Sequence, residues 1–257
     1  MDRRAHVVDW SCELVGTAVL VLGGLSAVVA DFAPGSPVAS LVPSASLRLL
    51  LTGGLFAGTG ALVTLSPVGR RSGAHLNPAV SLAFFAEGHL AVPDLVGYVV
   101  AQCLGALAGT ATLAVAWGKR AASLRDGLTQ PGRGLSPLAA AGVEALMTGV
   151  LVLTLFAFVS STRTARWTPL AAWAVITVLV WQGAPYTGTS LNPARSLGPA
   201  VVSGHWGDYW VYLVGPLTGA AAAVGLWRAS ERQTLTAKLF HDPRYHSAVR
   251  SLLPVKP

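Results

Sequence analysis

The sequence has little charge, two asparagines, two cysteines and two methionines in 257 residues. Charged residues make up 11% of the chain, against about a quarter in soluble proteins. This scarcity excludes an ordinary soluble surface, and the 53% of hydrophobic residues lie in long uncharged runs typical of a membrane protein. The net charge of +7 does not predict nucleic-acid binding, because the basic residues flank apolar runs instead of forming one patch.

The sequence also lacks the usual motifs of metal, phosphate and nucleophile chemistry. It has no His-Glu-x-x-His zinc motif and no phosphate loop, so we expect no metal and no cofactor. The stretch 188–191 loosely resembles a nucleophile loop, but no apolar run carries a histidine that could act as its base. An intramembrane enzyme is therefore disfavoured. Cys12 and Cys103 lie within apolar runs and are interpreted as small buried residues without a disulfide.

Six apolar runs have the length, about 20 residues, that a helix needs to cross a bilayer. They lie at 10–30, 47–65, 95–117, 138–159, 167–181 and 209–227. Two further apolar pieces, 76–85 and 191–202, are about half as long and too short to span. The sequence therefore predicts an all-α membrane protein, with six transmembrane helices and two re-entrant half-helices in a single channel domain over 1–257.

An even number of spans places both termini on one side of the membrane. That side would hold twelve of the 18 Lys and Arg residues and the other side six. The excess predicts a multi-pass protein of the cell (plasma) membrane with both termini in the cytoplasm. The loop 119–133 is unusually basic for an outside loop, and the sequence offers no reason for it.

The two halves of the chain repeat one pattern of span, span, short Asn-Pro-Ala piece and span. Each half has one glutamate in its first span, Glu13 or Glu144, and one Gly-x-x-x-Gly pair in its last span, Gly105/Gly109 or Gly215/Gly219. We assign one repeat to about 8–118, the other to about 137–228, and a cytoplasmic tail, partly helical near 231–240, to 229–257. Three spans per half is an odd number, so the second half enters the membrane inverted. Inverted repeats place their broken helices against each other near the midplane.

The two asparagines of the chain each precede Pro-Ala on a half-length piece. The motifs are Asn77-Pro78-Ala79 and Asn192-Pro193-Ala194. Asparagine is a favoured helix N-cap and proline a favoured first helical residue, so each motif predicts a helix that starts inside the membrane. Two facing starts would present two amide side chains and two N-terminal dipoles of about +0.5 charge each. Water and neutral polar molecules could pass there, whereas cations and protons would be repelled.

Glu13 and Glu144 lie within spans, where a charged side chain costs about 2.5 to 3.5 kcal/mol. We expect each to accept hydrogen bonds from backbone N–H groups of a re-entrant loop, whose carbonyls then line the pore. The expected loop positions are Gly73, Ala74, His75, Gly188, Thr189 and Ser190. A proton relay is the alternative, but the spans contain no chain of further carboxylates or histidines. His75 could line the pore, although fixing the loop by hydrogen bonding is the favoured interpretation.

At these residues the sequence resembles the aquaporin family, also called the major intrinsic proteins. The resemblance covers about 8–228, and SGAHLNPAV and TGTSLNPARSLGPA are close to the two signature loops of the family. It implies six spans with two half-helices, a pore in each subunit and a homotetramer with four pores. It also implies water and small neutral solutes as permeants and the lipid bilayer as surroundings.

The resemblance further implies a second constriction made of four positions, one of them Arg195, which follows the second motif. By the spacing of the family the others are Val180, Thr189 and Ala57, and a shift of one residue would give Phe56 in place of Ala57. Water-selective members usually carry Phe and His at the positions of Ala57 and Val180. The smaller residues imply a wider opening, similar to that of the plant nodulin-26-like branch and its bacterial relatives. Their permeants include glycerol, urea, ammonia and undissociated metalloid acids.

An ion-coupled secondary transporter is the alternative function, because many are built from inverted repeats with broken helices. Such a protein needs a cation or proton site near the midplane, and amides with helix N-termini disfavour cations. The sequence leaves open which solute is physiological, whether the pore is gated, and what the basic tail and the loop 119–133 do.

Overall fold

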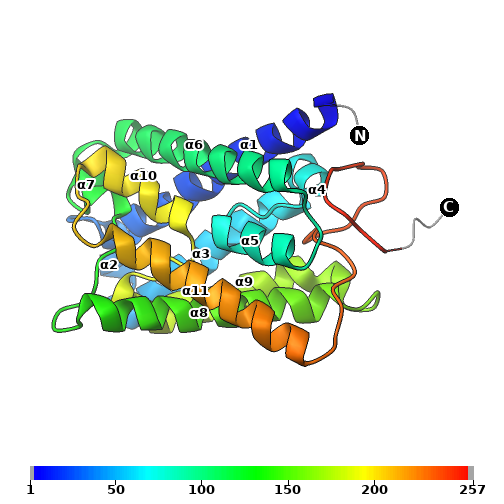
Figure 1. Ribbon diagram of the computed structural model, residues 1–257. Coiled ribbons are helices and arrows are strands. Elements are labelled where there is room, and N and C mark those ends of the chain that lie inside the picture. The colour runs from blue at the N-terminus through cyan, green and yellow to red at the C-terminus, as the bar shows by residue number, and fades with distance from the viewer. Residues whose placement is uncertain (1–2, 254–257) are drawn as a thin grey trace.

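The computed structural model describes residues 3–253 as a bundle of long helices (Figure 1). Residues 1–2 and 254–257, which include the Lys256 counted among the basic residues, lie outside the described residues. Within 3–253, six helices are long and apolar enough to cross a membrane. They are α1 (Arg3–Phe32), α3 (Ala45–Leu65), α6 (Val92–Trp117), α8 (Pro137–Val159), α9 (Thr168–Thr187) and α11 (Tyr209–Ala229). The predicted spans are confirmed.

Two half-length helices, α5 (Pro78–Ala86) and α10 (Pro193–Ser203), begin directly after the two asparagines. Asn77 and Asn192 have extended backbone, and their side-chain oxygens accept the N–H of the residue after proline at 2.8 and 3.0 Å. This is the N-cap arrangement that Asn-Pro favours. The buried first turns are made by Pro78, Ala79, Pro193 and Ala194. The short elements are α2 (Pro37–Leu41), α4 (Pro67–Ser72), α7 (Lys119–Ala122), η1 (Arg125–Gly127) and η2 (Ala165–Trp167).

Within each half, the first and last spans pack backbone against backbone at the glycine pairs. A Cβ atom added to Gly105 of α6 would lie 2.3 Å from the carbonyl oxygen of Leu14, and one added to Gly219 of α11 would lie 2.0 Å from that of Ala145. The other glycine of each pair meets a backbone oxygen of the same partner helix. Small residues are what allows such close approach in a membrane. The helices α3 and α9 pack on each other and join the two halves.

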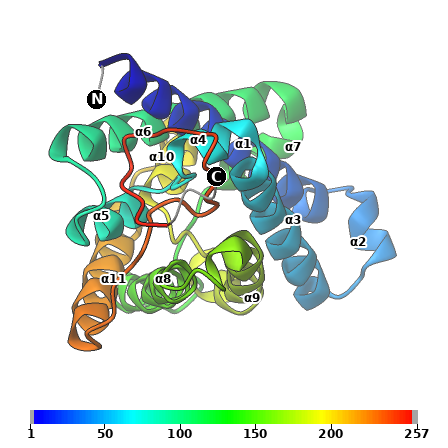
Figure 2. The ribbon, with the colours of Figure 1, turned by 90° about the vertical axis from the view of Figure 1, so that its right-hand side faces the viewer.

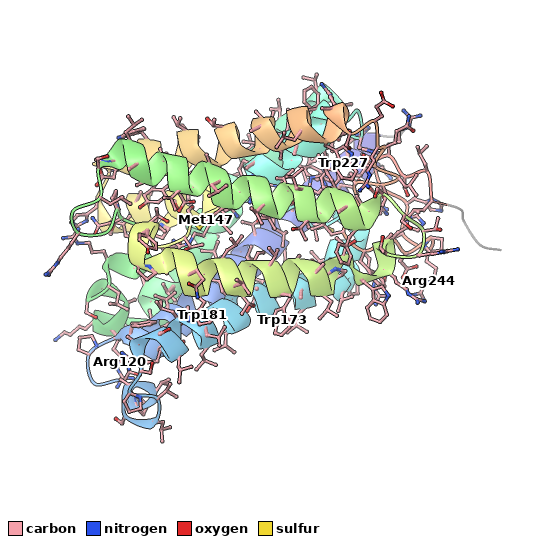
Figure 3. All side chains as sticks on the ribbon, turned by 90° about the horizontal axis from the view of Figure 1, so that it is seen from below. Arg120, Met147, Trp173, Trp181, Trp227 and Arg244 are labelled. Carbon is pink, nitrogen blue, oxygen red and sulfur yellow. The ribbon has the colours of Figure 1, made fainter. Side chains whose placement is uncertain are left out.

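Both described ends of the chain lie at one end of the bundle, which we call the terminal face, and the opposite end is the far face (Figure 1). Arg244 lies at the terminal face, and Arg120 lies at the far face (Figure 3). The half-helix α5 lies in the half of the bundle nearer the terminal face, and α10 lies in the half nearer the far face (Figure 1). The two half-helices therefore enter from opposite sides.

The residues after α11 are not helical, so the partly helical tail expected near 231–240 is wrong. Residues 234–253 instead fold back along the terminal face, with an isolated antiparallel bridge between Thr236 and Ser251 (Figure 2). Their backbone groups find partners outside a helix. The N–H of Leu235, for example, donates to the carbonyl of Val159 at 3.1 Å. Contacts with distant parts of the chain override the local helical preference here.

Candidate functional site

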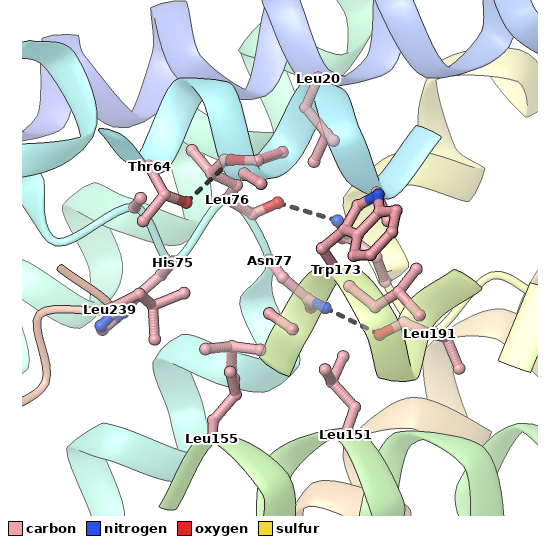
Figure 4. Close-up of a pocket in the computed structure, with 18 of the residues that line it drawn as sticks. Leu20, Thr64, His75, Leu76, Asn77, Leu151, Leu155, Trp173, Leu191 and Leu239 are labelled. Atoms are coloured by element: carbon pink, nitrogen blue, oxygen red, sulfur yellow. Dashed lines mark hydrogen bonds between the residues drawn. The ribbon is translucent and has the colours of Figure 1, made fainter. Parts of the chain in front are cut away.

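The two half-helices meet through reciprocal hydrogen bonds of their asparagines (Figure 4). Nδ2 of Asn77 donates to the carbonyl of Leu191 at 2.8 Å, and Nδ2 of Asn192 donates to the carbonyl of Leu76 at 2.8 Å. Each asparagine thus caps its own helix with its oxygen and binds the opposite loop with its nitrogen. The structure brings the two sequence motifs together at one point, and both side chains line the same cavity.

Glu13 holds the first re-entrant loop, residues 72–77. Its Oε1 accepts the N–H of His75 at 3.1 Å, and its Oε2 accepts the N–H of Leu76 at 2.7 Å. Two side chains also donate to it, the hydroxyl of Ser72 at 2.7 Å and the amide of Gln102 at 2.8 Å. The carboxylate has no exposed surface. Its four donors compensate the burial of a charge within a span.

Glu144 holds the second re-entrant loop, residues 187–192, in the same way. It accepts the N–H of Ser190 at 2.9 Å, the N–H of Leu191 at 2.8 Å and the hydroxyl of Thr187 at 2.6 Å. In the structure Gly105 and Gly219 hold equivalent places, because each faces the backbone oxygen of the residue that follows the glutamate. Three residues before them stand Gln102 in α6 and Pro216 in α11, so the second half has no counterpart of the glutamine. The hydrogen bonds that the sequence predicts for both glutamates are present.

The two loops also share an uncommon backbone. The residues with positive φ are Gly73, Ala74 and Leu76 in the first loop and Gly188, Thr189 and Leu191 in the second. Such a conformation costs of order 1–3 kcal/mol at each residue other than glycine and persists only where the surroundings hold it. The glutamates hold it by binding successive N–H groups.

Two adjoining cavities run along the bundle at these loops. The inner cavity, about 100 Å³, lies beside the asparagines, and the outer cavity, about 260 Å³, lies toward the far face. Their volumes have room for a few water molecules. Five residues line both cavities and define what we call the throat. They are Phe56, Ile176, Ser190, Leu191 and Arg195.

Arg195 is the charged residue of the throat. Its side chain is buried, one of its guanidinium nitrogens donates to the carbonyl of Gly127 at 2.8 Å, and its Cζ lies 5.7 Å from the ring centroid of Phe56. The loop 119–133, which the sequence left unexplained, supplies this carbonyl. The hydroxyl of Thr129 in the same loop also bonds that of Ser196 at 2.7 Å. This non-repeated loop therefore orients the guanidinium.

The other expected constriction residues lie at different levels of the passage. Ala57 lines the inner cavity only, whereas Val180 and Thr189 line the outer cavity only. Phe56, and not Ala57, lies beside Arg195. A helix turns by about 100° per residue, so a count that is off by one selects another face. Sequence reasoning missed Ile176, because one isoleucine in an apolar span carries no distinguishing signal.

The loop positions that were expected to line the passage are likewise divided between the inner and the outer cavity. Ala74 and His75 line the inner cavity, Gly188 lines the outer cavity, and the carbonyl of Gly73 accepts the N–H of Leu239 at 3.0 Å. The ring of His75 is both a lining group and a fixed one, with Nδ1 3.1 Å from the hydroxyl of Ser81. Within residues 3–253, no group of three or more His, Cys, Asp and Glu side chains could hold a metal ion.

The sequence was compared with known proteins. A model of the major intrinsic protein family matches residues 4–227. Mouse aquaporin-4 is 33% identical over 225 residues, which cover 84% of this chain and 65% of that protein. Maize aquaporin TIP4-1 is 34% identical over 217 residues, which cover 82% of this chain and 80% of that protein. The chain therefore spans less than two thirds of the mouse protein.

Among solved structures, an aquaglyceroporin from Plasmodium falciparum is similar with a TM-score of 0.71 and 24% identity. The match covers 86% of this chain and 95% of that one. At this identity the likeness concerns the fold alone, and it confirms the predicted fold class.

Proposed function

The chain belongs to the major intrinsic protein family, and from this premise we propose that it is a passive channel for water and small uncharged solutes that excludes ions and protons. One observation carries the proposal. Asn77 and Asn192 bind each other's loops beside a cavity that both line, and a second cavity adjoins it at the throat. The family consists of channels and not enzymes, in agreement with the sequence prediction.

The groups at the place where the two half-helices meet suit neutral molecules. An amide nitrogen has two N–H groups, and each asparagine uses one of them for the opposite loop. The second can donate to a molecule in the inner cavity, where a solute would also meet two positive helix N-termini. Arg195 adds a fixed positive charge at the throat. Cations and protons would meet an electrostatic barrier at both levels, whereas water would exchange one hydrogen bond for another.

We place the selectivity of the channel at the throat, with Phe56, Ile176 and Arg195 as its side chains. Phe56 brings an aromatic ring to the level where a wide opening was expected from Ala57. The part of that expectation that rests on Ala57 is therefore withdrawn, whereas the part that rests on Val180, with the permeants of the nodulin-26-like branch, stays a prediction. Water is therefore proposed as the main permeant, with solutes the size of glycerol limited by the ring.

Stopped-flow light scattering on proteoliposomes tests this function. We expect water flux well above that of protein-free liposomes, and we expect Phe56→Ala to raise glycerol and urea flux more than water flux. Leu55→Ala is the matched control, because Leu55 precedes Phe56 on α3 and its side chain is 47% exposed. Equal changes for all solutes in Phe56→Ala would contradict the assignment of the throat.

The same vesicles separate the channel from the ion-coupled transporter. A channel gives a flux that rises linearly with the solute gradient and needs no ion gradient. Saturation, or dependence on a sodium or proton gradient, would favour the transporter, although the groups at the crossing point disfavour a cation site.

We propose finally that the protein is a homotetramer in the plasma membrane, with both termini and the tail 229–257 in the cytoplasm. Support comes from the excess of basic residues on the side of the termini and from the family resemblance. The segments 8–118 and 137–228 are proposed as its two inverted repeats. Light scattering of the detergent-solubilised protein gives the number of subunits, and protease access to the tail in oriented vesicles gives its side.

A further inference from the structure

The segment 234–253, which we call the strap, lies across the terminal face of the bundle (Figure 2). Leu239 of the strap is one of the residues that line this cavity and is 7% exposed. Its side chain lies on the same side of the cavity as that of His75 (Figure 4). The strap therefore reaches the passage itself and does more than cover the helix ends.

The strap also takes up polar groups of the first re-entrant loop that would otherwise face water. The carbonyl of Gly73 accepts the N–H of Leu239 at 3.0 Å, and Nε2 of His75 lies 2.8 Å from the carbonyl of Ala237. A carbonyl only accepts, so Nε2 is the donor in this bond. The approach is close, because a Cβ atom added to Gly73 would lie 3.2 Å from the oxygen of Ala237. A solute that leaves the inner cavity toward the terminal face therefore meets polar groups of the loop that are already hydrogen-bonded to the strap.

One set of contacts holds the tip of the strap to α4 and to the first turns of α1. Asp242 forms an ion pair with Arg70 at 3.0 Å. Asp9 accepts the N–H of Ala248 at 2.6 Å and pairs with Arg71 at 2.6 Å. Both arginines belong to the twelve basic residues that the sequence places on the side of the termini, and both take part in docking the strap.

A second set holds its two ends. His89, in the turn after α5, has Nε2 2.7 Å from the hydroxyl of Thr234 and Nδ1 3.2 Å from the carbonyl of Arg250. The N–H of Arg250 returns a bond to the carbonyl of His89 at 2.9 Å. Ala237, Leu239 and Val249 join the main apolar cluster of the bundle. Two ends and a tip are fixed, so the strap is a docked element.

The strap is nevertheless joined to the bundle by an exposed link. Residues 231–233, between the end of α11 and Thr234, are exposed, as are residues 243–244 at the tip. Apart from the ion pair of Asp242 and the three apolar residues, its contacts are mostly single hydrogen bonds, each of which contributes little net stability. Segments held in this way open locally at a smaller free-energy cost than the helical core.

We propose that the docked strap partly closes the pore at the terminal face, with Leu239 as the side chain that obstructs the passage, and that full flux requires the strap to leave. The inference rests on the proposed channel function. It assigns the strap a gating role in addition to the selectivity proposed for the throat.

Cutting the strap from the folded protein tests the proposal. A site for a specific protease is placed at 231–233 of the full chain, and the purified protein is cut, washed in high salt and reconstituted. We expect the cut protein to conduct water at a rate several-fold above the uncut protein with the same site. The linker is exposed, so its sequence can change without touching the bundle.

A point variant gives a second test without cutting. Leu239→Ala removes the blocking side chain and keeps the backbone bonds, so we expect higher water flux in the intact chain. Leu252→Ala is the matched control, because Leu252 belongs to the same strap but is 52% exposed. Its flux should equal that of the wild type.

The outcomes distinguish the two proposals. Equal flux of cut and uncut protein, both above protein-free liposomes, would overturn the strap and leave the channel intact. Flux at the protein-free level in both would overturn the channel function, and the strap as a gate with it.

Discussion

The two re-entrant loops of this protein are held by the same kinds of hydrogen bonds, but different segments of the chain cover them. In each loop a buried glutamate binds two successive N–H groups, and an asparagine ties the loop to its counterpart. The first loop contacts the strap, where His75 lies against Ala237, whereas the second contacts the loop 119–133, where Gly188 lies against Thr129. Neither covering segment has a copy in the other half. The comparison teaches that the repeat builds the passage and the unrepeated segments decide what each end of it meets.

One pair of equivalent positions in the half-helices also shows a shared backbone with different side chains. Three residues after its asparagine, the first half-helix has Val80 and the second has Arg195, and both are buried. The equivalent backbone places thus present an apolar side chain at one level and a charge at the other. The inverted symmetry is a property of the backbone, and selectivity arises where the side chains depart from it.

The largest expected effect on stability comes from removing one of the glutamates that hold the re-entrant loops. Glu13→Ala leaves four buried donors without their acceptor, at about 1–3 kcal/mol for each unpaired group. Glu144→Ala leaves three, so its loss of stability should be smaller. The thermal unfolding midpoint in detergent measures both.

Glu231→Ala is the matched control, because Glu231 is exposed in the turn after α11. Its midpoint should stay at the wild-type value. If both buried variants unfolded at the wild-type temperature, the glutamates could not be what holds the loops.

The next effect compares the glycine contacts of the two halves. Gly219→Ala puts a methyl group 2.0 Å from a backbone oxygen of α8, and Gly109→Ala puts one 2.5 Å from a backbone oxygen of α1. We expect losses of about 1–3 kcal/mol, larger for Gly219. Gly225→Ala, on the same helix with no neighbour within 4 Å, should leave the unfolding midpoint unchanged. A loss at Gly225 equal to that at Gly219 would contradict the packing argument.

A third variant gives the second half-helix the valine that the first half-helix has three residues after its asparagine. Arg195→Val, measured with the strap cut, should keep water flux and raise proton leak about tenfold, which corresponds to a barrier lowered by about 1.4 kcal/mol. A pH-sensitive dye inside the vesicles reports the leak. Arg195→Lys keeps the charge and should leak less. Without any rise in the valine variant, the asparagines and helix starts alone would account for proton exclusion.

The smallest effect concerns the pH at the terminal face. Burial lowers the pKa of His89 from its ordinary value of 6.5, so the docked strap favours the neutral ring. The charged or titratable groups that face His89 are Arg250, Glu87 and His75. Above pH 6.5 the ring is neutral whether the strap is docked or released. As the pH falls below 6.5 the released state gains protons first, so docking weakens and flux rises.

The measurement is water flux of the intact chain between pH 7.5 and about 5.5. His89→Gln keeps a hydrogen-bonding side chain without titrating there and should flatten the profile. A rise with acid that persists in His89→Gln would assign the effect to another group. Protein with the strap cut should show no rise.

Much of this architecture can be predicted from short stretches of the sequence. Hydrophobic length distinguishes six spans from two half-helices, and Asn-Pro-Ala specifies where each half-helix starts, because capping involves only neighbouring residues. The repeated glutamates and glycines predict the loop supports and the close helix pairs. These features depend on spacing within one element or on equivalence between the two halves, and a single sequence contains both.

The tertiary structure alone decided which groups meet at the ends of the passage. The rotation of α3 brings Phe56 and not Ala57 to Arg195, a loop 68 residues earlier in the chain orients the guanidinium, and the strap reaches His75 from 162 residues away. Each of these contacts joins segments that share no repeat and no local pattern. Their geometry follows from how the whole bundle packs, and no stretch of sequence encodes it by itself.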